Sequence, residues 1–203
     1  MDLKAELARF DPTLSVEQAV MPPSSWYAEQ AIYALEQRAI FQKNWHPAAR
    51  LEELVSPGDY VSGCLAGMPW VVVRGSDGVL RAFHNVCRHK AAVVAQGVGS
   101  ADTLKCPYHG WVYGLDGRLQ RAPRIAGIKN FDREALSLPP LKVTEWGLWA
   151  WINADMDAAP LATKLPELTG MMEGRWDGLH FVGRRTYLLD CNWKVFIDNY
   201  LDG

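Results

Sequence analysis

The chain has 203 residues, of which 49% are apolar and 22% are charged. These fractions are ordinary for a soluble globular protein, and the length suffices to bury a core. Its 21 basic and 23 acidic side chains give a net charge of −2. Because no global excess of positive charge is present, we expect neither nucleic acid nor a membrane surface as a partner.

The compartment is indicated by apolar runs and by the cysteines. The longest uninterrupted apolar runs, such as 70–73 and 91–95, are far too short to cross a bilayer. The first residues carry acids and lack the apolar core of a secretory signal. We therefore predict a cytoplasmic protein, in which Cys64 and Cys191 are buried free thiols rather than a disulfide.

Residues 1–50 are predicted to form an N-terminal helical arm. Short helical and turn signals alternate up to Pro22 and Pro23. Ser25 then offers an N-cap, and apolar residues follow at approximate helical spacing until Pro47. We predict a packing helix of about five turns from Ser25 to Trp45, with no chemistry of its own.

Residues 51–155 change to the pattern of a compact antiparallel β domain. Turn signals rich in glycine and aspartate separate short apolar runs. A polar excursion, 118–140, precedes a last strand that is rich in tryptophan. The predicted strands are 60–65, 70–74, 79–83 and 146–153.

Residues 156–203 begin a further domain after a linker over 155–166. A weak helix is predicted over 165–172, a strand over 183–190 and a helix over 192–201. About fifty residues are too few for a second domain of their own. We therefore expect the sequence to be a fragment that is cut inside its second domain.

Two short stretches carry metal-binding chemistry, and each offers one thiol and one imidazole: Cys87 with His89, and Cys106 with His109. Face to face, the two loops would supply two sulfur and two nitrogen ligands to one metal centre. Zinc fingers usually pair cysteine with cysteine and histidine with histidine, and a disulfide would leave both histidines unexplained. The mixed loops favour a two-iron, two-sulfide cluster, with both cysteines on one iron and both histidines on the other.

Chance spacing is the alternative to a metal site. Against it, the second loop is crowded as a shielded cluster would require, by Pro107, Tyr108, Gly110, Trp111 and Tyr113. The remaining histidines, His46, His84 and His180, are interpreted as hydrogen-bonded structural residues.

These stretches resemble a known family. Residues 87–89 (Cys-Arg-His) and 106–111 (Cys-Pro-Tyr-His-Gly-Trp) resemble the Rieske signature, and 113–119 is similar to the large subunits of Rieske non-heme iron oxygenases. The likeness runs from about Trp26 to the last residue. Lys90 departs from the family's Arg or His but keeps the positive charge. The resemblance implies a Rieske [2Fe-2S] cluster whose ligands are Cys87, His89, Cys106 and His109.

The resemblance also implies the fold class, which is α+β. The helical arm is followed by an all-β Rieske domain of small antiparallel sheets and by the start of an α+β, helix-grip-like catalytic domain. Residues 192–202 resemble the opening helix of that domain. In the family, the acid at the position of Asp202 links the two redox centres. The ligands of the mononuclear Fe(II) are not in this sequence.

The predicted helix and its end carry two acidic residues. Asp198 and Asp202 lie four residues apart on one face, where like charges repel by a few tenths of a kcal/mol. Such a pair is better tolerated when one acid has a partner elsewhere, although two solvated acids would fit the spacing equally well. With the resemblance, we assign the catalytic bridging role to Asp202 and a structural role to Asp198.

The activity that the resemblance implies is that of a terminal oxygenase. Electrons from a reductase or ferredoxin pass through the cluster to a mononuclear iron that activates O2, and a small organic substrate is hydroxylated or demethylated. Residues 192–203 are similar to choline monooxygenase-like members that act on quaternary ammonium compounds; an aromatic substrate is the alternative. The family implies a homotrimer or heterohexamer. We expect this fragment alone to be inactive.

The cluster domain is rich in basic residues, and we predict that they bind an acidic electron donor, with a solvated surface as the alternative. The basic residues are Arg81, Arg88, Lys90, Lys105, Arg118, Arg121 and Arg124.

Two other functions stay open: a stand-alone Rieske-type electron-transfer module and a zinc-stabilised interaction domain.

Overall fold

A computed structural model describes residues 2–125 and 127–202; Met1, Ala126 and Gly203 lie outside the described residues. The chain divides into two compact units, each described here by itself. One is Phe41–Gly178, and the other combines Met1–Ile40 with Leu179–Gly203. The domain limits predicted from the sequence, 1–50, 51–155 and 156–203, stay predictions.

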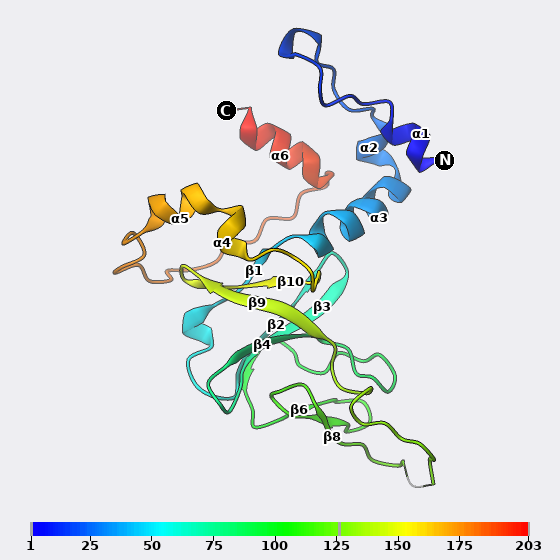
Figure 1. Ribbon diagram of the computed structural model, residues 1–203, viewed down its shortest axis with the longest axis vertical. Helices are drawn as coiled ribbons and strands as arrows, with labels where there is room; N and C mark the ends of the chain where they lie inside the picture. Colours follow the sequence, from blue (N-terminus) through cyan, green and yellow to red (C-terminus); the bar gives the residue numbers. More distant parts are fainter. Residues whose placement is uncertain (1, 126, 203) are drawn as a thin grey trace. The chain divides into compact units, whose positions relative to one another are not determined.

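The unit Phe41–Gly178 is built on two antiparallel sheets (Figure 1). Among the described residues, the larger sheet has the strand order β1-β10-β9-β4-β3-β2-β5, and the smaller has the order β6-β7-β8. The strands are β1 (His46–Arg50), β2 (Asp59–Leu65), β3 (Met68–Arg74), β4 (Leu80–His84), β5 (Val98–Ser100), β6 (Leu104–Lys105), β7 (Val112–Tyr113), β8 (Leu119–Arg121), β9 (Pro140–Trp146) and β10 (Trp149–Asn153).

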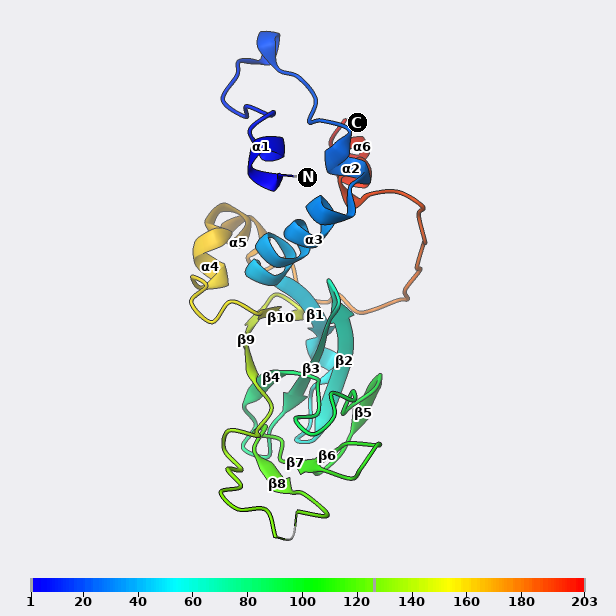
Figure 2. The same cartoon turned by 90° about the vertical axis from the view of Figure 1, so that its right-hand side faces the viewer.

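The smaller sheet lies at one end of the larger sheet, as both views show (Figures 1 and 2). The expected β domain of small antiparallel sheets is confirmed, and the α+β class with it. In the part of the chain that the structure describes, no helix has the length and apolar character that crossing a bilayer requires.

Strand β3 is the centre of this unit because both of its faces are covered. Val71, Val72 and Val73 are all fully buried, which explains a continuous apolar run where a half-exposed strand would alternate. Val71 and Val73 belong to the core that contains the cysteines of the two ligand loops. Val72 belongs to the core on the opposite face. One strand therefore supports the site and the rest of the sheet together.

Helices in this unit are short: η2 (Phe41–Lys43), η3 (Leu51–Glu53), α4 (Leu161–Lys164) and α5 (Pro166–Met172). The weak helix predicted over 165–172 is confirmed as α5. Beyond it, the ring of Trp176 packs edge-on against Trp146, with ring centroids 5.5 Å apart. The backbone at Gly147 has φ +60°, and a Cβ there would lie 2.7 Å from the Trp176 ring, so this turn requires glycine.

The other unit is helical, with α1 (Leu3–Leu7), η1 (Val16–Gln18), α2 (Ser25–Ala28), α3 (Gln30–Ala39) and α6 (Trp193–Leu201). The prediction of one helix from Ser25 to Trp45 is wrong. Glu29 adopts an extended conformation (φ −83°, ψ 123°) between α2 and α3, and α3 ends at Ala39. Residues 41–43 form only the short helix η2, and from His46, just beyond the predicted end, the chain pairs with β10. The helix predicted over 192–201 is confirmed as α6.

Two further expectations are wrong. Residues 183–190 form no strand, because alternation gives a strand only where a neighbour completes the hydrogen bonds. Cys64 and Cys191 are free, as expected, but exposed rather than buried. Cys64 lies on β2 opposite Pro69, close to the turn that joins β2 and β3.

Asn85 connects the sheet to the first ligand loop. It is 1% exposed and directly follows β4. Its Oδ1 accepts hydrogen bonds from the backbone N–H groups of Val94 (3.0 Å) and Ala95 (2.9 Å), and its Nδ2 donates to the carbonyl of Ala95 at 2.7 Å. The loop between these positions is therefore closed by one side chain.

Replacing this side chain is predicted to destabilise the unit. Asn85→Ala leaves three buried backbone groups without a partner, and we expect the free energy of unfolding to fall by about 3 kcal/mol. Urea unfolding followed by tryptophan fluorescence measures the change. Gln96→Ala, at an exposed position beside the same loop, is the control and should be neutral. A loss below about 0.5 kcal/mol for Asn85→Ala would contradict this role.

Candidate metal centre

Two loops with the same backbone construction carry the predicted ligands. In the first, the N–H of Ala91 donates to the carbonyl of Cys87 at 2.9 Å, and the N–H of Cys87 donates to the carbonyl of Ala92 at 2.8 Å. In the second, Gly110 and Trp111 make the corresponding bonds to Cys106, at 3.1 and 2.8 Å. Each cysteine therefore starts a tight turn, and each histidine lies within it.

The thiols and the imidazoles occupy different depths. Cys87 and Cys106 are 3% and 2% exposed and belong to one apolar core. His89 is exposed and His109 is partly exposed, and their ring centroids are 4.7 Å apart. The structure thus brings all four predicted ligands into the two loops as an inner thiol pair and an outer imidazole pair. Across the described residues, no three His, Cys, Asp or Glu side chains converge closely enough to hold one metal ion.

Tyr113 holds the inner part of the site. Its side chain is fully buried, and its hydroxyl lies 3.3 Å from Cys87 Sγ and accepts a hydrogen bond from the N–H of Arg88 at 2.9 Å. Burial, together with the contact to Cys87, raises the pKa of Tyr113 well above its ordinary value, so the hydroxyl keeps its proton and can donate it to the sulfur. The sequence predicted a shielding aromatic here. It gave no signal for the contact between the hydroxyl and the sulfur.

Aromatic rings cover the imidazoles. His89 stacks on the buried ring of Trp111, with centroids 4.9 Å apart and an angle of 7°, and Trp111 meets Phe131 edge-on. His109 lies against Tyr108, whose side chain is 65% exposed. Desolvation, then His109 and Lys90, lower the pKa of His89. A neutral imidazole is the form that binds a metal.

The two acids of α6 belong to the other unit. Asp202 is exposed at the C-cap of α6, and its backbone N–H donates to the carbonyl of Asp198 at 3.1 Å. Asp198 Oδ2 accepts a hydrogen bond from the hydroxyl of Tyr27 at 2.9 Å. Of the like-charged pair, Asp198 is therefore the one with a hydroxyl partner inside its own unit.

The remaining histidines have separate surroundings. His46 Nε2 lies 2.7 Å from the carbonyl of Phe41, and burial lowers the pKa values of His46 and His84. A neutral, half-buried ring suits the structural role predicted for both. His180 is exposed, in the other unit.

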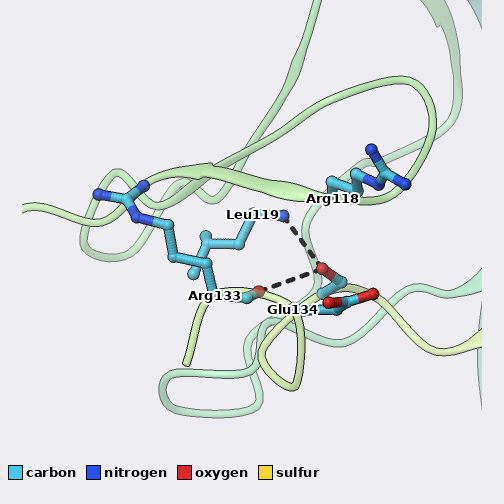
Figure 3. A pocket seen from close by; sticks show the side chains of 5 residues that line it. Arg118, Leu119, Arg133 and Glu134 are labelled. Carbon is cyan, nitrogen blue, oxygen red and sulfur yellow. Dashed lines mark hydrogen bonds between the residues drawn. The ribbon is translucent and has the colours of Figure 1, made fainter. Parts of the chain in front are cut away.

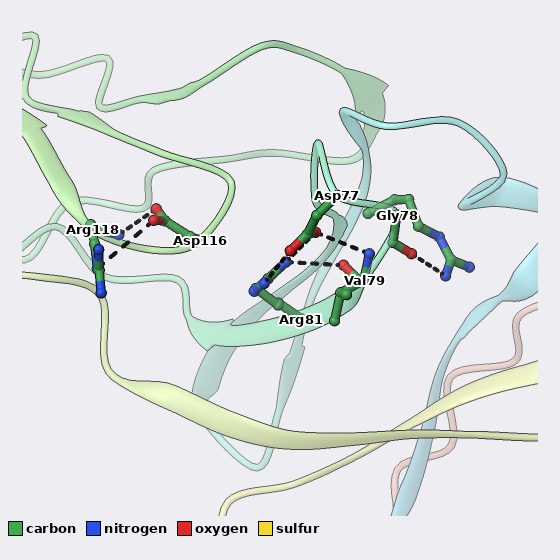
Figure 4. Close-up of polar contacts among 7 residues, drawn as sticks. Asp77, Gly78, Val79, Arg81, Asp116 and Arg118 are labelled. Carbon is green, nitrogen blue, oxygen red and sulfur yellow. Dashed lines mark hydrogen bonds and ion pairs between the residues drawn. The ribbon is translucent and has the colours of Figure 1, made fainter.

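The predicted basic surface is partly neutralised by ion pairs. Both terminal nitrogens of Arg81 donate to the carboxylate of Asp77 at 2.7 Å, which holds the pKa of that carboxyl well below its usual range (Figure 4). Arg118 Nε lies 3.9 Å from Asp116. The exposed cations next to the ligands are Arg88, Lys90 and Lys105.

A pocket opens beside β8, away from the ligand residues. Arg118, Arg133 and Glu134 line it, together with Leu119 and Ser137 (Figure 3). The Ser137 hydroxyl accepts from the N–H of Leu119 at 3.3 Å and donates to the carbonyl of Arg133 at 3.2 Å, which ties the rim to β8. No predicted ligand lines this pocket, and its charges are mixed.

The chain is similar to known proteins over most of its length. Residues 44–132 match the model of the Rieske [2Fe-2S] domain. Choline monooxygenase, chloroplastic, of Beta vulgaris is 40% identical over 206 residues, covering 98% of this chain and 46% of that protein. The carnitine monooxygenase oxygenase subunit of Acinetobacter pittii is 36% identical over 184 residues, covering 89% of this chain and 50% of that subunit. The chain thus spans about half the length of the curated relatives it matches.

A solved structure agrees with these relatives. A quaternary ammonium Rieske monooxygenase, described with carnitine oxidation and inter-subunit electron transfer, matches with a TM-score of 0.82 and 36% identity. The match covers 88% of this chain and 50% of that one.

The backbone of the first loop is strained at Ala91. Ala91 has φ +56° where the second loop has Gly110 at φ +70°. A side chain in this left-handed region costs roughly 1–2 kcal/mol, and glycine gives part of that back as unfolded-state entropy. We expect Ala91→Gly to raise the free energy of unfolding by about 0.5–1 kcal/mol, measured by urea unfolding.

Two further variants are controls for the strain at Ala91. Gly110→Ala should lower stability by roughly 1 kcal/mol, and Ala92→Gly, next to Ala91 but outside the left-handed region, should also lower it. If Ala91→Gly and Ala92→Gly destabilised equally, the backbone at Ala91 would not be strained.

Proposed function

Because this chain belongs to the Rieske oxygenase large subunits, we propose that Cys87, His89, Cys106 and His109 bind its [2Fe-2S] cluster and that the whole protein is an oxygenase. The observation that carries the ligand assignment is the separation of the four side chains by depth. Two buried thiols and two outer imidazoles match a cluster with one iron held by sulfur and the other by nitrogen. A single zinc ion would need all four around one point.

The residues around the ligands have definable tasks. When bound, the cluster stores and passes on one electron, at a higher potential than an all-thiolate cluster. The Tyr113 hydroxyl donates towards Cys87 and so stabilises negative charge on that sulfur. Trp111 and Phe131 keep water from one side of His89. The partly exposed His109 and the exposed Tyr108 leave an edge where charge can leave the site.

We further propose the activity of the whole protein. The similarity to choline and carnitine monooxygenases runs through the cluster loops to α6, and so includes the start of the predicted catalytic domain. The remaining half would hold a mononuclear Fe(II) that activates O2. Both relatives are named for substrates with a quaternary ammonium group, so we propose hydroxylation or demethylation of such a compound rather than of an aromatic ring.

The partners follow from the same proposal. Electrons come from a reductase or ferredoxin, and the exposed cations Arg88, Lys90 and Lys105 offer it a basic surface next to the imidazoles. The ion-paired Arg81 and Arg118 contribute less to this surface. We propose a homotrimer or heterohexamer in which Asp202 links the cluster of one subunit to the iron of its neighbour. A cytoplasmic location stays a prediction.

The activity is tested with the full-length protein, its metals loaded and a reductase added. We expect oxygen consumption coupled to product from choline or carnitine. Product from an aromatic hydrocarbon instead would overturn the substrate class. A cluster that is reduced normally, with no product from either class, would favour the stand-alone electron carrier.

Ligand removal tests the cluster assignment. Cys87→Ala and Cys106→Ala each take away one of two thiolates, and we expect complete loss of the visible absorption together with bound iron and sulfide. Cys64→Ala removes an exposed thiol from the same unit and is the matched control, with unchanged absorption. A normal cluster spectrum in Cys87→Ala would refute the assignment of that ligand.

Asp202 has its own prediction. In the full-length protein, Asp202→Asn should keep the cluster spectrum and lower product formation by about 100-fold or more, because misplacing the groups that link two reacting centres has effects of that size. Asp190→Asn, also exposed and close to the start of α6, is the control and should be fully active. Wild-type turnover in Asp202→Asn would rule out the bridging role.

A further inference from the structure

A buried carboxylate lies in the unit formed by the two ends of the chain, and nothing in the proposed chemistry uses it. Glu36, in α3, is 7% exposed. Its Oε1 accepts a hydrogen bond from Lys194 Nζ at 2.5 Å, and its Oε2 accepts one from Trp193 Nε1 at 2.8 Å. The two donors are consecutive residues in the first turn of α6, more than 150 residues away in the sequence. Bonds that involve a full charge are the stronger kind.

The neighbouring helix α2 holds α6 at two further points. Asn192 caps α6, because its Oδ1 accepts from the backbone N–H of Lys194 at 3.1 Å, while its Nδ2 donates to the carbonyl of Tyr27 at 3.1 Å. The hydroxyl of Tyr27 donates to Asp198, one turn before the end of the helix. Figures 1 and 2 show α6, in red, next to the blue helices α2 and α3.

These polar contacts, rather than packing, fix the described part of α6. None of its residues is buried, and Phe196, Tyr200 and Leu201 on its sides are exposed. A helix of nine residues is about 13 Å long and stiff, so bonds at its first turn set where its last residue lies. That last position leads directly to Asp202.

We propose that Glu36 is a positioning residue for Asp202, an inference that rests on the bridging role proposed above. By binding Trp193 and Lys194 with separate oxygens, Glu36 fixes the rotation of α6 about its own axis as well as its place. A buried ion pair adds little net stability compared with two apolar side chains of similar volume. Its directional bonds therefore matter more for the orientation of α6 than for the stability of the unit.

The test uses the full-length, metal-loaded protein in four forms besides the wild type: Glu36→Gln, Lys194→Met, Glu36→Gln with Lys194→Met, and Glu29→Gln. Glu29 is exposed at the start of α3 and makes the matched change of charge. Three quantities are measured: amide hydrogen exchange over 193–202, the visible spectrum of the cluster, and the rate at which the reduced cluster is reoxidised in a single turnover.

We expect Glu36→Gln and Lys194→Met each to speed exchange over 193–202 by about tenfold or more and to slow reoxidation by about tenfold or more, with the cluster spectrum unchanged. The double variant should be no worse than either single variant, because the two residues act as one pair. Glu29→Gln should match the wild type.

Two outcomes would overturn the proposal. One is faster exchange with wild-type reoxidation, since a merely structural role would give that result. The other is loss of the cluster spectrum together with the rate. Asp202→Asn separates this inference from the proposed function: if it is slow while Glu36→Gln is normal, only the positioning role fails. If Asp202→Asn is itself normal, the bridging role fails and the inference with it.

Discussion

The proposed site depends on a difference in burial between cysteine and histidine side chains that lie only two or three residues apart in the sequence. In each loop the cysteine carbonyl accepts a hydrogen bond from the N–H of the fourth residue after it, and the cysteine N–H donates to the carbonyl of the fifth residue after it. This closed turn lets the cysteine side chain enter the core while the histidine stays at the surface. A longer or looser loop would allow both side chains to reach water, and the inner thiols would lose their shielding.

The core beneath the loops explains why the turns can be so tight. Val71 and Val73 of the central strand β3 share one apolar cluster with both cysteines, Trp111 and Tyr113. Asn85 satisfies the backbone groups that the first loop would otherwise bury without partners. The positions of the proposed ligands are therefore set by a sheet whose other face has its own core, and movement of β3 beneath the loops would cost packing on both faces.

Local chemistry in the sequence was enough to predict the small antiparallel sheets and the helix α6, and to propose the four cluster ligands, because each has a short-range signal. Mixed Cys/His loops, turns with glycine and apolar residues at helical spacing are all of this kind. Long-range contacts had no such signal. The helix expected from Ser25 to Trp45 is interrupted by the extended backbone of Glu29 and ends at Ala39, and residues 183–190 alternate without a neighbour to pair with. The Tyr113 contact with Cys87 spans 26 residues and could not be found from spacing.

The lack of a long-range signal also explains why spacing alone could not distinguish the two acids of α6. Their spacing of four residues makes Asp198 and Asp202 equivalent in an isolated helix, but Tyr27 reaches only Asp198. The hydrogen bonds of α6 with Glu36 and Tyr27 fix its rotation about its own axis. That rotation decides which carboxylate faces α2 and which remains available. Residues near the beginning of the chain thus give two otherwise equivalent acids different surroundings, which is the physical basis for assigning them different tasks.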